Sequence, residues 1–294
     1  MIHSPVLLKE IIEILNPKEN QDFIDATIGE GGIALEVLKR TSPKGRLLGI
    51  DFDEEILKEA KENLAKSGML QRVVLVNGNY RFIKEIAQEK SFLNPKGIIF
   101  DLGFSRWHIE KSGRGFSFKK EELLDMRYNK DLQLTAFEII NKWPQKEIEK
   151  ILKEYGEERE ARRIANEIVR ARQKKPILFA SDLSKIIEKI VPRGKRKIHP
   201  ATKTFQALRI AINQELENLK EGLKGAFELL KNGGKILVIS YHSLEDKIVK
   251  TFFKEKAKEG SLKILTPKPI IPKEEEVLKN PSARSAKLRA AIKN

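Results

Sequence analysis

Three aspartates follow apolar runs in the first hundred residues, each at the point where a predicted buried strand ends. Asp25 ends "DFID", Asp51 ends "RLLGID" and Asp101 ends "GIIFD". In a parallel sheet the carboxyl ends of the strands meet at one edge, which is where such folds bind ligands. We therefore expect the three carboxylates along one rim. The alternative for Asp101 is structural, a carboxylate that caps the turn after its strand.

A glycine-rich turn, "DATIGEGG" at 25–32, connects the first predicted strand to a helix. Gly29, Gly31 and Gly32 allow the backbone to pass close to a ligand where a Cβ would clash. Asp51 ends the next strand, where its carboxylate can accept both ribose hydroxyls of a nucleoside. The combination of turn and acid in this order predicts a nucleoside cofactor, although a turn without a ligand is the alternative.

The identity of that nucleoside depends on charge. The spacing Gly29, Gly31, Ala34 also fits the G-x-G-x-x-A pattern of dinucleotide-binding folds. Asp25 can face the cationic methionine end of S-adenosylmethionine, and Glu30 would repel a pyrophosphate, so the charges favour S-adenosylmethionine. Tyr80 or Asn79, in "NGNY" after the third strand, is placed to border the adenine, and a core or capping role is the alternative for each.

The residues after the fourth strand, "DLGF" at 101–104, suit an acceptor with an exocyclic amine. The lone pair of such an amine is delocalised into its ring, so acceptors for its N–H groups favour the geometry needed for attack on a methyl group. The Asp101 carboxylate or the carbonyls of Leu102 and Gly103 can supply them, and Phe104 can stack on a base. The order is similar to the "D-P-P-Y" box of amino-methyltransferases.

Two absences narrow the chemistry. The chain has no cysteine, which excludes a thiolate nucleophile of the kind that usually activates a pyrimidine ring carbon, and fits a reducing cytoplasm. The four histidines, at 3, 108, 199 and 242, have no metal-ligand spacing, so no metal site is expected.

The sequence has no signal peptide and no apolar run of membrane-spanning length. We expect a soluble cytoplasmic protein without a membrane partner; the oligomeric state stays open.

Positive charge is concentrated in one part of the chain. Residues 106–204 hold 25 Lys and Arg against 15 Asp and Glu, which is +10 of the chain's net +15. Such a distribution indicates a polyanion-binding surface, and general solubility is the alternative. The predicted contacts to the phosphates of such a partner are basic residues in "SGRGFSF", in an arginine-bearing helix and in "PRGKRK". They are Arg114, Arg163, Arg193, Lys195, Arg196 and Lys197.

Alternating apolar runs and amphipathic helices define the elements that position these groups. Strands are predicted at 22–28, 46–52, 72–78, 97–103 and 235–241, with late strands at 262–267 and 286–292. Helices separate the early strands, which indicates a doubly wound α/β fold. The strand rhythm stops after residue 104 for about a hundred residues, where a helical insert includes a helix at 157–173. A helix at 244–257 should be capped by Ser243 and Asp246, and 267–281 should be a mobile loop.

With these residues in view, the chain resembles the bacterial 16S ribosomal RNA cytosine-N4 methyltransferase family. The similarity covers nearly the whole length in order. It rests on "HSPVLLKE", "DATIGEGG", "LLGIDFD", "FDLGFS", "RGFSF", "LDMRY", "YGEERE", "HPATKTFQALRIAINQEL", "GGKILVISYHSLEDKIVK" and "NPSARSAKLR".

The resemblance implies a class I S-adenosylmethionine-dependent methyltransferase fold, with a methyltransferase domain in 1–105 and 205–294 and a helical RNA-binding insert in 106–204. It implies methylation of the N4 amine of a cytosine in the decoding centre of the small ribosomal subunit, so 16S rRNA or the subunit is the partner. The implied cofactor contacts are Gly31, Gly32, Ile33, Asp51, Tyr80, Asp101 and His108. Ile33, Tyr80 and "SRWH" at 105–108 depart from the family's usual histidine, phenylalanine and "SSPQ".

Three other functions remain open from the sequence. An N4-cytosine or N6-adenine methyltransferase of DNA would use the same acceptor chemistry. A ribosome-assembly protein could bind RNA with a vestigial cofactor pocket, although the intact Asp25, Asp51 and Asp101 argue against it. A dehydrogenase is a weaker alternative based on the glycine spacing alone.

Overall fold

The computed structural model describes residues 5–191 and 198–294, and these form two compact units. The sheet unit comprises the described residues up to Gly103 together with Leu216–Asn294, and the helical unit is Phe104–Glu215. The sequence placed the second boundary at 204/205. In the structure the boundary follows Glu215, because Phe205, Leu208 and Ile212 pack into the core of the helical unit.

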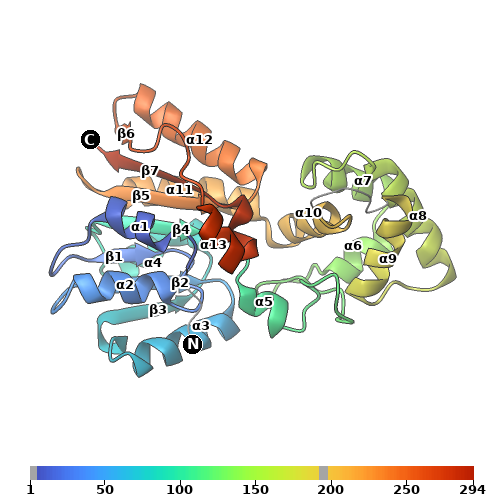
Figure 1. Ribbon diagram of the computed structural model, residues 1–294, viewed down its shortest axis with the longest axis horizontal. Coiled ribbons are helices and arrows are strands. Elements are labelled where there is room, and N and C mark those ends of the chain that lie inside the picture. The colour runs from blue at the N-terminus through green and yellow to red at the C-terminus, as the bar shows by residue number, and fades with distance from the viewer. Residues whose placement is uncertain (1–4, 192–197) are drawn as a thin grey trace. The chain divides into compact units, whose positions relative to one another are not determined.

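The sheet unit is built on a seven-stranded sheet in the order β3-β2-β1-β4-β5-β7-β6 (Figure 1). The first five strands are parallel, and β7 is antiparallel to both of its neighbours. The strands are β1 Phe23–Asp25, β2 Leu47–Asp51, β3 Val73–Asn77, β4 Gly97–Asp101, β5 Lys235–Ser240, β6 Leu262–Ile264 and β7 Lys287–Lys293. All lie within the predicted runs except β7, which ends one residue beyond its run, and the predicted α/β class is confirmed.

Successive strand residues face opposite sides of this sheet, and both sides are covered by helices. Ile24, Leu48 and Phe100 belong to one hydrophobic cluster, whereas Phe23 and Leu47 belong to another. Burial on both faces explains why these strands are continuous apolar runs rather than alternating ones. The covering helices are α1 Leu8–Leu15, α2 Gly32–Arg40 and α3 Glu54–Lys66 on one face, and α4 Ile83–Glu89, α11 Glu215–Leu229 and α12 Ser243–Lys258 on the other.

Two predictions about the C-terminal part of the sheet unit are wrong. Residues 267–281 are not a loop throughout, because they include α13 (Glu274–Lys279), Ile270 bridges to Leu288, and the Glu276 carboxylate accepts the Leu7 N–H at 2.8 Å. The cap of α12 is His242 rather than Ser243. Its ring accepts the Glu245 N–H at 3.4 Å, and the Glu245 carboxylate accepts the His242 N–H in return.

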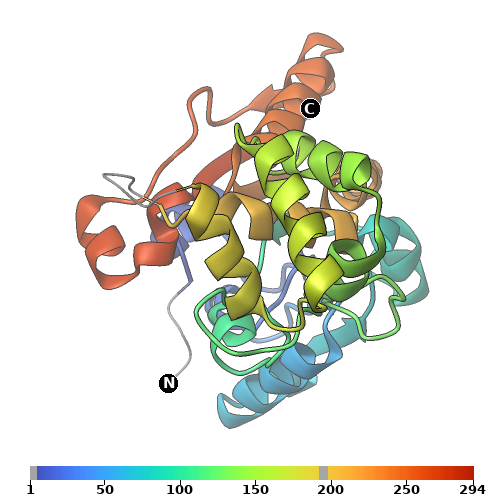
Figure 2. The same cartoon turned by 90° about the vertical axis from the view of Figure 1, so that its right-hand side faces the viewer.

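The helical unit has a hydrophobic core of its own, around which its helices pack (Figure 2). Arg209 and Glu215 form a buried bidentate ion pair at 2.8 and 2.9 Å near its C-terminal end. The helices are α5 Arg106–Glu110, α6 Ala136–Lys142, α7 Gln145–Glu154, α8 Ala161–Lys174, α9 Ala180–Ile190 and α10 Thr202–Asn213. In the described part of the chain no helix combines the length and the apolar character needed to cross a membrane.

Candidate functional site

Asp25, Asp51 and Asp101 end three strands of the sheet and lie on its carboxyl edge, as the sequence predicted. Strands β1 and β4 are neighbours, with Asp25 opposite Ile99. From β1 the chain proceeds outward to β2 and β3 on one side and then returns to β4 on the other. The rim therefore includes the point where the strand order reverses, the usual ligand-binding position of doubly wound sheets.

The glycine turn is tied to β2 through the carboxylate of Asp51. The Gly29 N–H donates to Asp51 Oδ2 at 2.9 Å, and the Asp53 N–H donates to Oδ1 at 3.0 Å. Gly29 and Gly31 have φ angles of 53° and 87°, in the left-handed region that favours glycine. Each carboxylate oxygen has more than one lone pair, so the two backbone bonds fix Asp51 and leave it able to accept ribose hydroxyls.

Asp25 carries a buried acceptor that the protein itself does not satisfy. The side chain is 1% exposed, its Oδ1 accepts the Thr27 N–H at 3.3 Å, and its Oδ2 has no hydrogen-bond partner among the described residues. Burial, with the charges of Asp101 and Asp51 adding to it, raises the pKa of Asp25 to about 8. A ligand cation beside this oxygen would satisfy it and favour the ionised form.

Asp101 is held from two sides. Its backbone N–H donates to Thr27 Oγ1 at 2.7 Å, which joins the end of β4 to the turn after β1. The Tyr241 hydroxyl donates to Asp101 Oδ1 at 2.9 Å. Burial raises the pKa of Asp101 to about 7; the Tyr241 hydrogen bond opposes this rise and the Glu245 charge adds to it. Asp101 therefore takes part in a half-buried hydrogen-bond network and is not an isolated turn cap.

Two of the predicted cofactor contacts have side chains that pack within the sheet unit. Ile33 is 5% exposed in the hydrophobic cluster beneath α2, so a ligand at the turn would meet its backbone. The Tyr80 ring packs edge-on against Phe100 at 5.6 Å. A Cβ on Gly222 would lie 2.7 Å from the Tyr80 ring, so α11 holds the ring closely. Gly32 is the first residue of α2.

The residues after Asp101 divide between the two units. Leu102 is buried and its N–H donates to the Ile239 carbonyl at 3.0 Å, and Gly103 has a φ of 90°. In the helical unit Phe104 is 37% exposed and stacks on Phe116. His108 is buried, and its Nδ1 accepts the Ser105 N–H at 3.1 Å. The roles of these residues toward a base or cofactor stay predictions.

Arg114 does not have the placement expected of an RNA contact. Its side chain is 5% exposed, and its guanidinium donates to the carbonyls of Arg127 and Tyr128, both at 2.8 Å. It also lies over the ring of Trp107. Because these contacts are internal to the helical unit, we assign Arg114 a structural role.

Of the other predicted RNA contacts, one lies among the described residues. Arg163 is exposed on α8, where it pairs with Glu160 at 2.9 Å. The predicted contacts at Arg193, Lys195, Arg196 and Lys197 lie outside the described residues.

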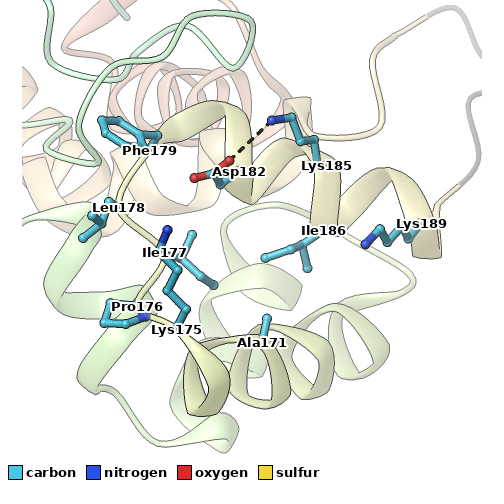
Figure 3. A pocket seen from close by; sticks show the side chains of 10 residues that line it. All are labelled: Ala171, Lys175, Pro176, Ile177, Leu178, Phe179, Asp182, Lys185, Ile186 and Lys189. Atoms are coloured by element: carbon cyan, nitrogen blue, oxygen red, sulfur yellow. Dashed lines mark hydrogen bonds and ion pairs between the residues drawn. The ribbon is translucent and has the colours of Figure 1, made fainter.

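A basic hollow of about 330 Å³ lies between the end of α8 and α9 and was not identified from the sequence (Figure 3). Ile177 and Ile186 are among its apolar lining, and Lys175, Lys185 and Lys189 surround it. Lys185 also contacts the Asp182 carboxylate at 3.4 Å. An apolar floor with a cationic border suits an unpaired base and its phosphates.

Thr27 and Tyr241 also belong to the rim. The sequence indicated Tyr241 as a neighbour of the pocket, but neither residue was identified as a partner of Asp101. Thr27 occupies the glycine turn, where its hydroxyl accepts a bond from β4. Tyr241 follows β5, and β5 pairs directly with β4. The signal for Tyr241 in the sequence is its position after a strand end, in "SYHSLED".

Comparisons with known proteins agree with this architecture. The model of the MraW methylase family matches residues 1–294. The chain is 47% identical to ribosomal RNA small subunit methyltransferase H of Dictyoglomus thermophilum, over 98% of this chain and 95% of that protein. It is 45% identical to the protein of the same name from Persephonella marina, over 98% of both. The crystal structure of a putative rRNA-methylase from Clostridium thermocellum matches the fold, with a TM-score of 0.50, 13% identity and full coverage of both chains.

Proposed function

The chain belongs to the MraW methylase family, and we propose that it transfers a methyl group from S-adenosylmethionine to the N4 amine of a specific cytosine in 16S rRNA, in the decoding centre of the small ribosomal subunit. The observation that carries the proposal is the pair of strand-end carboxylates, Asp25 and Asp101, on the neighbouring strands β1 and β4. One suits the cationic end of the cofactor, and the other suits the amine that receives the methyl group. The relatives' names supply the small-subunit RNA as the substrate.

S-adenosylmethionine is the cofactor, and the rim has groups that fit it. The orphaned Oδ2 of Asp25 is a buried acceptor for a cationic group. Asp51 is fixed by two backbone N–H groups and can accept the ribose hydroxyls. Gly29 and Gly31 adopt left-handed φ angles in the turn before α2. Because neither has a side chain, the cofactor can approach the backbone of this turn. Tyr80 would border the adenine.

When bound, S-adenosylmethionine would supply an electrophilic methyl group, with its sulfur as the leaving group that keeps the bonding electrons. The Asp101 carboxylate and one of the carbonyls of Leu102 and Gly103 would accept the two N–H groups of the amine, which favours a localised lone pair for the attack. The amine nitrogen must then lose one proton. The Asp101 carboxylate, with a pKa of about 7, is able to take it. An Asp101 that is ionised before transfer is therefore the active form.

The helical unit is proposed to bind the RNA around the target cytosine. The exposed Arg163 and the lysine-bordered hollow of α8 and α9 offer cations to phosphates, and Phe104 offers a partly exposed ring for stacking. The basic segment 193–197 is expected to add contacts. This unit would supply sequence-independent affinity, while the rim selects the amine.

A methylation assay with small subunits from cells that lack this protein tests the proposal. The purified protein and isotopically labelled S-adenosylmethionine should produce labelled N4-methylcytidine, identified by mass spectrometry of 16S rRNA digested to nucleosides. A duplex DNA should receive no label. Label on a ring carbon, on a ribose oxygen or on DNA would contradict the proposed acceptor.

A further inference from the structure

Tyr241 occupies a fixed position beside the proposed acceptor site. It follows β5, whose residue Ile239 is opposite Asp101 of β4. Its hydroxyl donates to Asp101 Oδ1 at 2.9 Å, and its backbone N–H donates to Glu245 Oε2 at 2.8 Å. A Cβ on Gly103 would lie 3.5 Å from the Tyr241 ring, so the ring also packs against the backbone that follows Asp101. Backbone and ring contacts together restrict where the hydroxyl can lie.

The other charged groups that act on Asp101 are acidic. Glu245, 2% exposed at the start of α12, raises the pKa of Asp101, and Asp101 in turn raises the pKa of Asp25. The charge of Asp51 also raises the pKa of Asp25, and the charge of Glu276 raises the pKa of Tyr241. Burial among acids opposes ionisation of Asp101, whereas a hydroxyl that donates to its carboxylate stabilises the ionised form. The Tyr241 hydroxyl is thus the contact that counteracts this acidic environment.

We propose that Tyr241 is a positioning residue for methyl transfer, which orients the Asp101 carboxylate and keeps it in the ionised form that accepts an amine N–H. With the hydroxyl bonded to Oδ1, Oδ2 is left for the exocyclic amine of the substrate base. The inference rests on the proposed function, because it assigns Asp101 the amine. It adds a residue that follows the helical insert in the sequence, more than a hundred positions after Asp101.

The variant Tyr241→Phe tests this role, because it keeps the ring against Gly103 and removes the hydroxyl alone. A hydrogen bond to a charged group contributes about 1.5–3 kcal/mol, so kcat should fall about 10- to 100-fold. The pH at which kcat is half-maximal should rise by about one unit, since the bond that lowers the pKa of Asp101 is lost. KM for S-adenosylmethionine should change less than threefold. Tyr155→Phe, in the helical unit, is the matched control and should change none of these values.

A second measurement does not depend on methyl transfer. Carbon-13 NMR of labelled aspartate, assigned to Asp101 by its loss in Asp101→Asn, reports the ionisation of this carboxyl directly. Its midpoint should be higher in Tyr241→Phe than in the wild type. Equal midpoints would overturn the inference even if the wild type methylates cytosine. Conversely, a raised midpoint in a protein that forms no N4-methylcytidine would support the Tyr241–Asp101 coupling while the proposed reaction fails. A variant with the wild-type kcat and pH profile, or one affected only in KM for the cofactor, would also overturn it.

Discussion

The Gly29 N–H donates to the Asp51 carboxylate at 2.9 Å, so the glycine turn after β1 and the acid at the end of β2 form one structural unit. The second carboxylate oxygen accepts the Asp53 N–H, at the residue that caps α3. A single side chain thus orients the turn, and in the proposed function it also accepts the ribose hydroxyls. Loss of this carboxylate should affect cofactor affinity twice, through the missing acceptor and through the released turn.

Replacing Asp51 with alanine should weaken S-adenosylmethionine binding by about 100-fold, because at least two bonds to a charged acceptor are lost at about 1.5 kcal/mol or more each. Isothermal titration calorimetry measures this directly. Glu54→Gln, an exposed residue that pairs with Lys58 nearby on α3, is the control and should bind normally. Normal affinity in Asp51→Ala would show that the ribose lies elsewhere.

Alanine at Gly31 should have two separate effects, one on stability through its left-handed φ angle and one on cofactor affinity through its added Cβ. Gly31→Ala should lower the free energy of unfolding by about 1–2 kcal/mol from the left-handed backbone alone, since its Cβ would meet Leu64 only at an ordinary 3.6 Å. Gly68→Ala, at a φ of 67° with open space around it, should cost about the same. The two variants should differ in cofactor affinity, which only Gly31→Ala reduces. Equal affinities would contradict a close approach of the cofactor at Gly31.

The buried acid Asp25 predicts an unusual pH dependence of stability. Its pKa is raised from 3.8 to about 8 in the folded protein, so between these values the folded state binds more protons than the unfolded state. The contribution of Asp25 to the free energy of unfolding therefore falls as pH rises from about 4 to about 8. Asp25→Asn should melt at a higher temperature than the wild type at pH 8 and at nearly the same temperature at pH 4.

The same residue should couple cofactor binding to proton release. A cation beside Asp25 favours the carboxylate, so S-adenosylmethionine should bind the wild type more tightly at pH 8.5 than at pH 6.5, with protons released to the buffer. Calorimetry in two buffers of different ionisation enthalpy measures the release. In Asp25→Asn both the release and the pH dependence should decrease; an unchanged pH dependence would exclude Asp25 as the partner of the cation.

The basic hollow of the helical unit should contribute to RNA affinity. Replacing Lys175, Lys185 and Lys189 with alanine should reduce the slope of log affinity against log salt by about 2, given about 0.7–0.9 per phosphate contact. Filter binding to a 16S rRNA fragment at several salt concentrations gives the slope. The matched control replaces three exposed lysines of α7, Lys146, Lys150 and Lys153, and should leave the slope nearly unchanged. Equal slopes in the two triple variants would place the RNA on another surface.

Site residues that are marked by a local sequence pattern could be predicted from the sequence alone. Asp25, Asp51 and Asp101 were identifiable because strand ends are readable from apolar runs, and parallel strands bring those ends together. The Tyr241 contact was not, because it depends on the pairing of β4 with β5 across a long insert. A basic local sequence suggested a surface site for Arg114, whereas tertiary contacts bury it.

Two further predictions were wrong, one because of tertiary contacts and the other within a local capping pattern. The composition of 267–281 indicated a loop, but the Glu276 contact with Leu7 and the Ile270 bridge to β7 order part of it, and both partners are distant in sequence. The residue pattern at the start of α12 suggested Ser243 as the cap. A histidine can also accept the required bond, and His242 does so.

The kinetics of Asp101→Asn test the central claim most directly. The amide is nearly the same size and can still bond to Tyr241, but it has no negative charge to favour the amine or to take its proton. With small subunits as substrate, we predict that kcat for N4-methylcytidine formation falls about 100-fold or more, while calorimetry shows that S-adenosylmethionine still binds. Turnover equal to that of the wild type would contradict the assignment of Asp101 as the group that receives the amine.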